Sequence, residues 1–441
     1  MTEASPAVRA STRAEPARGL AASTTSALAS RPRGGPAWLE ARRAEAAARF
    51  EATGLPSVTD EAFRFTSLGR VLRVPFAAGA VGERLVSPFD GLTARRIHVD
   101  NGRIASDAFG TADGIDVRTL GDVLASDPGL LEPYLAKLAA SDNGFVAQNT
   151  ALFQDGVVIV ARRKAKSGIV HLAYSGSGAS PALGTPRVLV VAEPESELFL
   201  LESHVGQGEF LESSVTEVFV GQGATVEHVR VELGTEHSSA LSTTAVRQSR
   251  DSRYRSRVLS FGGKTTRVDL RIELAEQGAE CALDGVFLAT AGTLLDHHTL
   301  VVHASPRCTS RERYKGIADG DGIAVFDGTV VVRSGASGTE AHQENRNLLL
   351  SNDAVIHAKP HLEIDTDDVK CSHGATVGRL DPAQLFYLRS RGIDAEVARS
   401  LLTYAFAREV VGTVSRSDVR DVLEDIVATR LPSGAAAREL A

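Results

Sequence analysis

A long series of short apolar segments, separated by turns rich in glycine, constrains this chain more than any other feature. The segments are Val157–Ala161, Ile169–Tyr174, Val188–Ala192, Leu198–Glu202, Val215–Val220, Val226–Val231, Arg267–Glu273, Leu300–His303 and Ile323–Val332. Short β-branched runs between glycine turns are typical of strands. About two hundred residues of strands with almost no helical pattern leave a sandwich, a barrel or a β-solenoid. Two-residue hairpin turns are scarce, which favours the stacked coils of a parallel β-helix over a sandwich.

Helical patterns precede and follow this region. Pro36 at a first-turn position and Gly54 as a stop predict one helix, and Val117–Ala140 has a second helical pattern that is broken at Pro128. After Asp381 we expect helices over 383–391, from Asp394 to about 412, and from Ser417 to about 430. The predicted division is a disordered tail (1–35), a mixed, largely helical N-terminal domain (36–150), the β-helix core (151–375), a C-terminal helical domain (376–431) and a tail (432–441).

Composition, charge and cysteine content exclude several classes of protein. The 441 residues have a net charge of −7, which argues against a nucleic-acid binder. The three cysteines Cys281, Cys308 and Cys371 are too few and too far apart for a disulfide framework. No run of about 18 apolar residues or ordered secretory signal is present. We therefore expect a protein of the reducing cytoplasm, with an organellar stroma as the alternative, and no membrane partner.

The most informative motif is Ile364–Arg379, in which Cys371 stands two residues before His373. A thiolate and an imidazole are ligands for iron, copper or zinc, but two ligands do not close a structural metal site. The pair therefore predicts ligands on a partner chain, a transient metal, or no metal at all. The alternative is a small buried thiol beside a hydrogen-bonded histidine. A Cys/His nucleophile is conceivable, yet no oxyanion device is visible.

The histidine cluster and the acidic turns of this sequence do not predict metal or calcium sites. His297 and His303 share one face of a strand and His298 lies on the other, so we expect three hydrogen-bonded sheet histidines and no metal centre. Asp319–Gly322 and Asp365–Asp368 do not fit a calcium loop and are expected to be solvated turn carboxylates. The sequence has no GxxxxGK[ST] phosphate loop, so the chain should not hydrolyse ATP by itself.

Several longer motifs, in order, resemble the SufB/SufD family of the SUF iron–sulfur cluster assembly machinery. They are Tyr314–Ile317, Phe326–Gly328, Gln343–Leu350, Lys359–Ile364, Asp368–Thr376 and Phe386–Gly392. The resemblance is dense from about residue 280 to 412, and weaker over 38–65 and 145–156. It implies a right-handed parallel β-helix flanked by N- and C-terminal helical domains.

The resemblance also implies partners and a role. Members act in a complex of SufB, SufD and two copies of the ABC-type ATPase SufC, in which SufB and SufD pair through the end of the β-helix. The C-terminal helices engage SufC, so the resemblance places the ATPase contact on the helices at 394–412 and 417–430. By matching, His373 falls on a proposed ligand of the nascent iron–sulfur cluster at the SufB–SufD interface, and Cys371 on a cysteine of the same motif. A reduced flavin in the complex and a homodimer of the isolated chain are further expectations.

Within the family the residues favour SufD. A SufB-like chain should have a glutamate at Gly374 and a catalytic cysteine near 354–357, and this chain has neither. The expected function is a non-ATPase scaffold subunit. A SufB-like scaffold, a β-helix enzyme acting on polysaccharides, and a binding module in which Cys371 and His373 are inert remain as alternatives.

Overall fold

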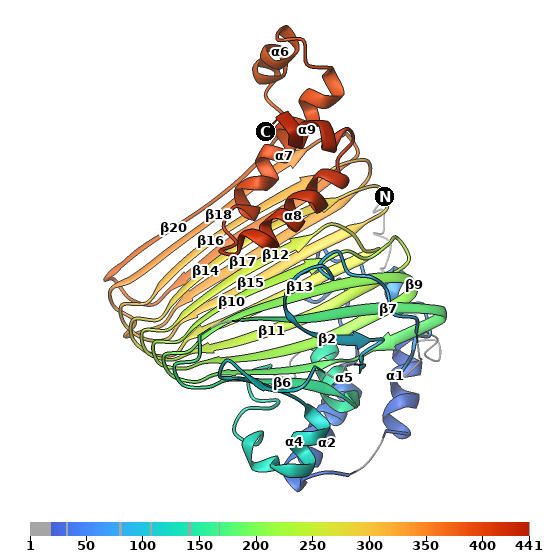
Figure 1. Ribbon diagram of the computed structural model, residues 1–441, viewed down its shortest axis with the longest axis vertical. Helices are drawn as coiled ribbons and strands as arrows, with labels where there is room; N and C mark the ends of the chain where they lie inside the picture. The colour runs from blue at the N-terminus through green and yellow to red at the C-terminus, as the bar shows by residue number, and fades with distance from the viewer. Residues whose placement is uncertain are drawn as a thin grey trace, which may run out of the picture.

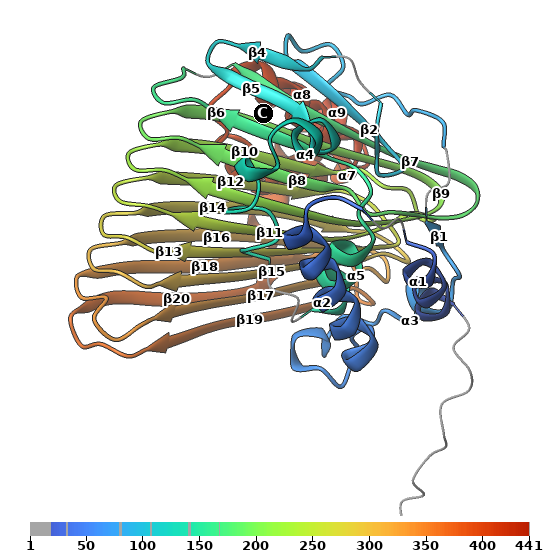
Figure 2. The same cartoon turned by 90° about the horizontal axis from the view of Figure 1, so that it is seen from below.

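The computed structural model describes residues 19–31, 34–78, 82–105, 108–139, 143–166 and 168–440. From Gly156 onward its strands pair in parallel with strands 26 residues away (Ser239 with Thr265) to 32 residues away (Ile323 with Val355). Only a coil that returns above itself gives such pairing, because parallel neighbours need long connections. The protein is a parallel β-solenoid, as the sequence predicts, with helices at both ends (Figures 1 and 2).

Each coil contributes one strand to each of two walls. The even wall contains β10 (Thr225–Glu232), β12 (Arg253–Ser260), β14 (Glu280–Ala289), β16 (Thr309–Ala318), β18 (Thr339–Leu349) and β20 (Val369–Gly378). The odd wall contains β6 (Gly156–Ala161), β8 (Arg187–Ala192), β11 (Ser239–Gln248), β13 (Thr265–Leu274), β15 (Leu294–His303), β17 (Ile323–Val332) and β19 (Val355–Ile364). The long strands β7 (Ile169–Gly184) and β9 (Glu197–Val220) pair with both walls.

The N-terminal part covers the first coils. Its elements are α1 (Leu20–Ala29), α2 (Ala37–Thr53), η1 (Glu61–Phe63), α3 (Gly69–Leu72), β1 (Ala77–Ala78), β2 (Arg95–Asp100), β3 (Arg103–Ile104), β4 (Gly110–Ala112), β5 (Ile115–Thr119), α4 (Leu120–Ser126), η2 (Pro128–Leu130) and α5 (Gly144–Leu152). Helix α2 ends at Gly54, whose φ of 67° suits glycine, as predicted. The C-terminal elements are α6 (Pro382–Ser390), α7 (Ala395–Val411), α8 (Ser417–Thr429) and α9 (Gly434–Leu440). The three helices predicted after Asp381 are confirmed.

Three segments differ from the sequence-based expectation. The helical pattern over 117–140 gives only α4 and η2 among the described residues, because Ile115–Thr119 pair with β6 as β5 and Pro128 ends the helix. Most of the expected tail, residues 1–18, lies outside the described residues. Its remainder includes α1, whose buried Leu20 packs beside Phe63 and Val71. The expected C-terminal tail includes α9, which buries Ala437.

The helices cover the outer faces of the two walls. Apolar side chains on α7 and α8, such as Val410 and Leu423, pack on Val229 and Val286 of the even wall. Leu120 and Leu131 pack on Val158 and Leu189 of the odd wall. Between the walls, the lumen of the solenoid has its own apolar core, which runs from Ile97 in β2 to Ala354 before β19. Each wall is therefore buried on both faces over much of its area.

The lumen also contains charged groups. Arg230 points inward and lies 2.7 Å from both Glu202 and Glu232. Burial opposes protonation of His204, but the carboxylates of Glu212, Glu232 and Glu202 outweigh it and raise the pKa of His204 to about 9. Buried ions of this kind need paired partners. The strands β11, β12, β16 and β18 were not among the predicted segments, because polar side chains such as Thr244, Ser256 and Gln343 occupy their buried lumen faces.

The buried pair Arg187–Glu217 joins the N-terminal part to the odd wall. Their side chains lie 2.7 Å apart and are fully buried. The Glu217 carboxylate also accepts hydrogen bonds from the backbone N–H groups of residues 136–139. Arg187 donates to Asn149 and Thr150 of α5. One ion pair therefore holds a turn and a helix on the solenoid.

We predict that Glu217→Ala lowers the free energy of unfolding by about 3–5 kcal/mol, because it leaves a buried guanidinium without its carboxylate. Chemical denaturation followed by circular dichroism measures the effect. Glu193→Ala is the control, since Glu193 pairs with Arg162 at a half-exposed position and should cost less than about 1 kcal/mol. Equal losses in the two variants would contradict the assigned role of Glu217.

A second prediction concerns acid stability. Burial between Phe287 and Tyr314 lowers the pKa of His297 to about 3, against 6.5 in the unfolded chain. Below about pH 6.5 the unfolded chain binds the extra proton, so stability is lost as the pH falls, by about 1.4 kcal/mol per unit. His297→Gln should reduce the loss between pH 6.5 and pH 5 by roughly 2 kcal/mol in denaturation curves.

The control for this experiment is His237→Gln, because the His237 side chain is 61% exposed. This variant should follow the wild-type pH dependence. If His297→Gln also lost stability in parallel with the wild type, the buried neutral imidazole would not be a source of the acid sensitivity.

Candidate functional site

The C-terminal end of the solenoid is open. Within the described residues β19 pairs only with β17, and β20 pairs only with β18, so each has one unpaired edge. Both strands are largely exposed or half-buried, in contrast to the buried strands before them. Figure 1 shows β20 as the last strand of its wall, with α6 projecting beyond it. The lumen therefore has a mouth at this end.

Cys371 and His373 lie in β20 at this mouth. Alternate residues of a strand face the same side of the sheet, and the half-buried Cys371 packs against the apolar core of the lumen. His373 is exposed and follows two residues later, so it faces the same side. Ser372, between them, faces outward, where its Oγ lies 2.8 Å from Nδ1 of His342. The two predicted ligands are therefore on one face of one strand.

A row of polar side chains extends inward from His373. His373 pairs with Gln343 of β18, and Gln343 pairs with Glu312 of β16. Gln343 and Glu312 are 3% and 4% exposed. Nε2 of Gln343 donates to Oε2 of Glu312 over 2.7 Å. The exposed imidazole is thus the outer member of a buried polar row.

The thiol at this site is not activated. Partial burial raises the pKa of Cys371, whereas a catalytic cysteine needs a lowered pKa. Burial likewise raises the pKa of Glu312 to about 7. The site therefore combines an exposed imidazole with a half-buried thiol whose pKa is raised.

The histidines of the Asp296–His303 segment lie where the alternation predicts. His297 and His303 face the lumen, where their Nε2 atoms lie 2.9 Å from Oγ of Ser260 and 2.8 Å from Oγ of Ser310. His298 faces outward, 3.0 Å from Asp296. They are hydrogen-bonded sheet histidines, as predicted. Among the described residues no group of three His, Cys, Asp or Glu side chains could hold a metal ion.

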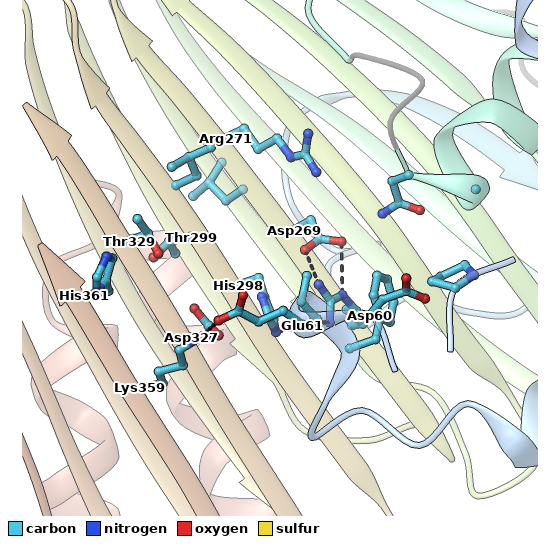
Figure 3. Close-up of a pocket in the computed structure, with 18 of the residues that line it drawn as sticks. Asp60, Glu61, Asp269, Arg271, His298, Thr299, Asp327, Thr329, Lys359 and His361 are labelled. Carbon is cyan, nitrogen blue, oxygen red and sulfur yellow. Dashed lines mark hydrogen bonds and ion pairs between the residues drawn. The ribbon is translucent and has the colours of Figure 1, made fainter. Parts of the chain in front are cut away.

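A second hollow lies on the outer face of the odd wall. This pocket of about 740 Å³ is bounded by η1 and by β13, β15, β17 and β19 (Figure 3). Its charged groups are largely paired with one another. Lys359 lies 3.0 Å from Glu61 and 3.6 Å from Asp327, and Arg267 lies 2.9 Å from Asp269. Ion pairs between its own lining residues therefore engage Lys359 and Arg267 in this pocket.

The segment that bounds this pocket fastens the N-terminal part to the late coils. The Arg267 guanidinium lies 3.8 Å above the ring of Phe63 and donates to the carbonyl of Ala62. The ring of Phe65 stacks on His357 at 4.3 Å. Residues of η1 and its neighbours thus reach the coil next to the open end.

The sequence pattern alone missed Gln343 and Glu312 as parts of the site. A usable signal exists in their spacing, because Glu312, Gln343 and His373 are 31 and 30 residues apart, which is one coil of the solenoid. Residues one coil apart stack above one another. Applying the coil length to His373 would have identified both.

Together these features define a class of protein: a β-solenoid whose open end presents a thiol and an imidazole on one face of its last strand. A family model described as SUF system FeS cluster assembly, SufBD core domain, matches residues 174–406. The chain is 30% identical over 398 residues to an iron–sulfur cluster assembly SufBD family protein of Synechocystis, covering 85% of this chain and 87% of that protein.

Two further relatives agree. The chloroplastic protein ABCI7 of Arabidopsis thaliana is 31% identical over 399 residues, covering 87% of this chain and 84% of the relative. The iron–sulfur cluster assembly protein SufD of Escherichia coli is 32% identical over 216 residues, about half of each chain (49% and 51%). The chain belongs to the SufBD family of the SUF iron–sulfur cluster assembly system. In the described part of the chain no helix is both long and apolar enough to cross a membrane.

Proposed function

We propose that this chain is a SufD-type, non-ATPase scaffold subunit, which supports assembly and transfer of an iron–sulfur cluster at its interface with a SufB-type paralogue. The observation that carries the proposal is the incomplete pair Cys371 and His373 on the unpaired last strand of the solenoid. A cluster held there needs further ligands. The cluster is the cargo of the assembly, and the remaining ligands would come from the partner chain.

The donor set fits this cargo. Iron–sulfur clusters are held by thiolates, and histidine replaces cysteine at some irons. His373 is exposed, and no hydrogen bond occupies its ring within the described residues. We assign the ligand role first to His373. Cys371, whose pKa is raised, serves as ligand, as sulfur relay or as packing.

Two residue-level features support a SufD-type role over a SufB-type one. Gly374 stands where a glutamate is expected in SufB, although a Cβ at that position would meet no atom within 4 Å. Residues 354–357 include no cysteine, and the other two cysteines, Cys281 and Cys308, are buried. The chain thus lacks an exposed cysteine on which sulfur could first build, apart from Cys371.

The open end also supports the partner assignment. Unpaired strand edges pair readily with another strand, and β19 and β20 offer ten-residue edges. Five of the eight exposed large hydrophobic side chains of the described residues lie at this end: Val355, Ile364, Val377, Phe386 and Tyr387. We place the SufB-type partner on the edges of β19 and β20. A second copy of this chain fits the same edges when the partner is absent.

We place the SufC-type ATPase on the C-terminal domain, residues 376–431. Phe386 and Tyr387 of α6 are 75% and 57% exposed, and α6 stands away from the walls in Figure 1. Exposed aromatic side chains are common anchors of protein interfaces. Movement of the ATPase would reach β20 through α6, since only residues 379–381 separate them.

Three free thiols support a reducing compartment, for which we propose the cytoplasm. A reduced flavin in the complex stays a prediction from the family resemblance. The domain division proposed from the sequence is kept, with the cluster site at the boundary between the β-helix core and the C-terminal domain.

We predict that His373→Ala leaves assembly of the complex with SufB- and SufC-type partners intact and lowers cluster content by roughly tenfold or more, because an exposed side chain contributes little to folding while a lost ligand weakens the site. Gel filtration reports assembly, and absorbance with iron and sulfide analysis reports cluster content. Cys371→Ser in the same assay tests the thiol.

The matched control is His237→Ala, which removes a 61% exposed imidazole between β10 and β11, outside the proposed interface. It should assemble and form clusters as the wild type does. Full cluster content in His373→Ala would refute the ligand role.

We further predict that Phe386→Ala combined with Tyr387→Ala weakens binding of the ATPase by roughly tenfold or more, as expected for interface anchors. Binding is measured by titration calorimetry with the full chain. Val58→Ala, at a 54% exposed apolar residue far from α6 in the sequence, is the control. Unchanged affinity in the double variant would move the ATPase contact elsewhere.

A further inference from the structure

The side-chain amide of Gln343 is buried in the lumen, and its two polar atoms differ in their hydrogen bonding. Its side chain is 3% exposed, its nitrogen donates to Glu312, and its buried oxygen Oε1 has no hydrogen-bond partner among the described residues. A buried amide oxygen without a partner is costly. This oxygen is therefore available to accept a hydrogen bond from a donor on a neighbouring strand.

The amide has a defined direction. The nitrogen of Gln343 points toward β16, where it donates to Glu312, because the ionised form of that carboxyl only accepts hydrogen bonds. The oxygen is on the other side of the amide carbon. The next strand on that side is β20, where the residue paired with Gln343 is His373.

On the opposite, odd wall, the glycine at position 328 leaves space for the Gln343 amide. A Cβ added to Gly328 of β17 would lie 2.3 Å from Nε2 of Gln343. Any larger residue there would push the amide out of place. The glycine, the carboxylate and the strand register together hold the amide beside His373.

We infer that Gln343 is a positioning residue for the cluster site: its Oε1 accepts a hydrogen bond from one ring nitrogen of His373, which leaves the other nitrogen free to bind iron. The inference rests on the ligand role of His373 proposed above. Histidines that bind metals usually donate their second ring N–H to such a partner, which sets the orientation and tautomer of the ring. Glu312 supports the arrangement through Gln343 without touching the cluster.

The test uses the assembled complex with SufB- and SufC-type partners, reconstituted with iron and sulfide. Pulsed electron paramagnetic resonance of the reduced cluster measures the ¹⁴N coupling of a bound imidazole, and chelator challenge measures the rate of cluster loss. In Gln343→Leu we expect an altered ¹⁴N coupling and roughly tenfold or more faster loss of the cluster, the range found when partners of metal ligands are removed.

Two further variants separate positioning from packing. The exchange Glu312→Gln with Gln343→Glu keeps a donor at position 312 and an acceptor beside His373, so it should restore both readouts. Asn347→Leu removes another buried amide of β18, which pairs with Val377 and not with a ligand. It should leave the ¹⁴N coupling unchanged.

The outcomes distinguish this inference from the proposed function. If His373→Ala removes the ¹⁴N coupling while Gln343→Leu leaves the coupling and the loss rate unchanged, the positioning role is wrong and the ligand role stands. If the exchange variant behaves as Gln343→Leu does, the effect is one of packing and the positioning role is wrong. If His373→Ala leaves the coupling intact, both the ligand role and the positioning role fall.

Discussion

The in-register stacking of parallel strands is the constraint on which the rest of this structure depends. Each coil must return to a position directly above its predecessor, so side chains one coil apart lie in continuous rows. These rows decide which residues meet. They place Glu312, Gln343 and His373 side by side although about 30 residues separate neighbours in the chain. They also concentrate Arg230 and its three carboxylate partners in the early lumen.

The last strand at each end of such a stack has an unpaired backbone edge unless another element covers it. The two ends of this solenoid differ in whether these strand edges are covered. At the N-terminal end β5 pairs antiparallel with β6, β2 pairs with β7, and α4 packs beside them. At the C-terminal end β19 and β20 have no such cover within the described residues. The asymmetry agrees with a subunit that is completed by a partner at one end only.

The charged lumen is consistent with the same view of specificity. Buried ion pairs seldom add stability relative to apolar packing, but breaking one is costly. In a solenoid the coils are alike, and a shift by one coil would keep most apolar contacts. Arg230 in the lumen and Arg187 on the outer face of the odd wall each pair with carboxylates of the same or an adjacent coil. We interpret such pairs as devices that hold the coils in a single register.

How much the sequence determines can be judged from particular elements. Glycine turns and β-branched runs specify strands, and Gly54, Asp394 and Ser417 specify helix ends, because these signals act through the local backbone. The alternation of His297 and His298 likewise follows from local geometry. The resemblance of the motifs around Cys371 was enough to indicate the family. All of these are short-range or pattern-based properties.

Tertiary structure alone decided the rest. The polar strands β11, β12, β16 and β18 have no simple apolar alternation, because buried polar side chains such as Thr244, Gln343 and Asn345 face the lumen, where they contact residues far away in the chain. Helix α1 is stabilised because Leu20 is buried against a distant segment that includes Phe63 and Val71. The row behind His373 depends on coil length, and the openness of β20 depends on the absence of a further coil in the described structure. Long-range stacking supplies these contacts, and no local pattern specifies them.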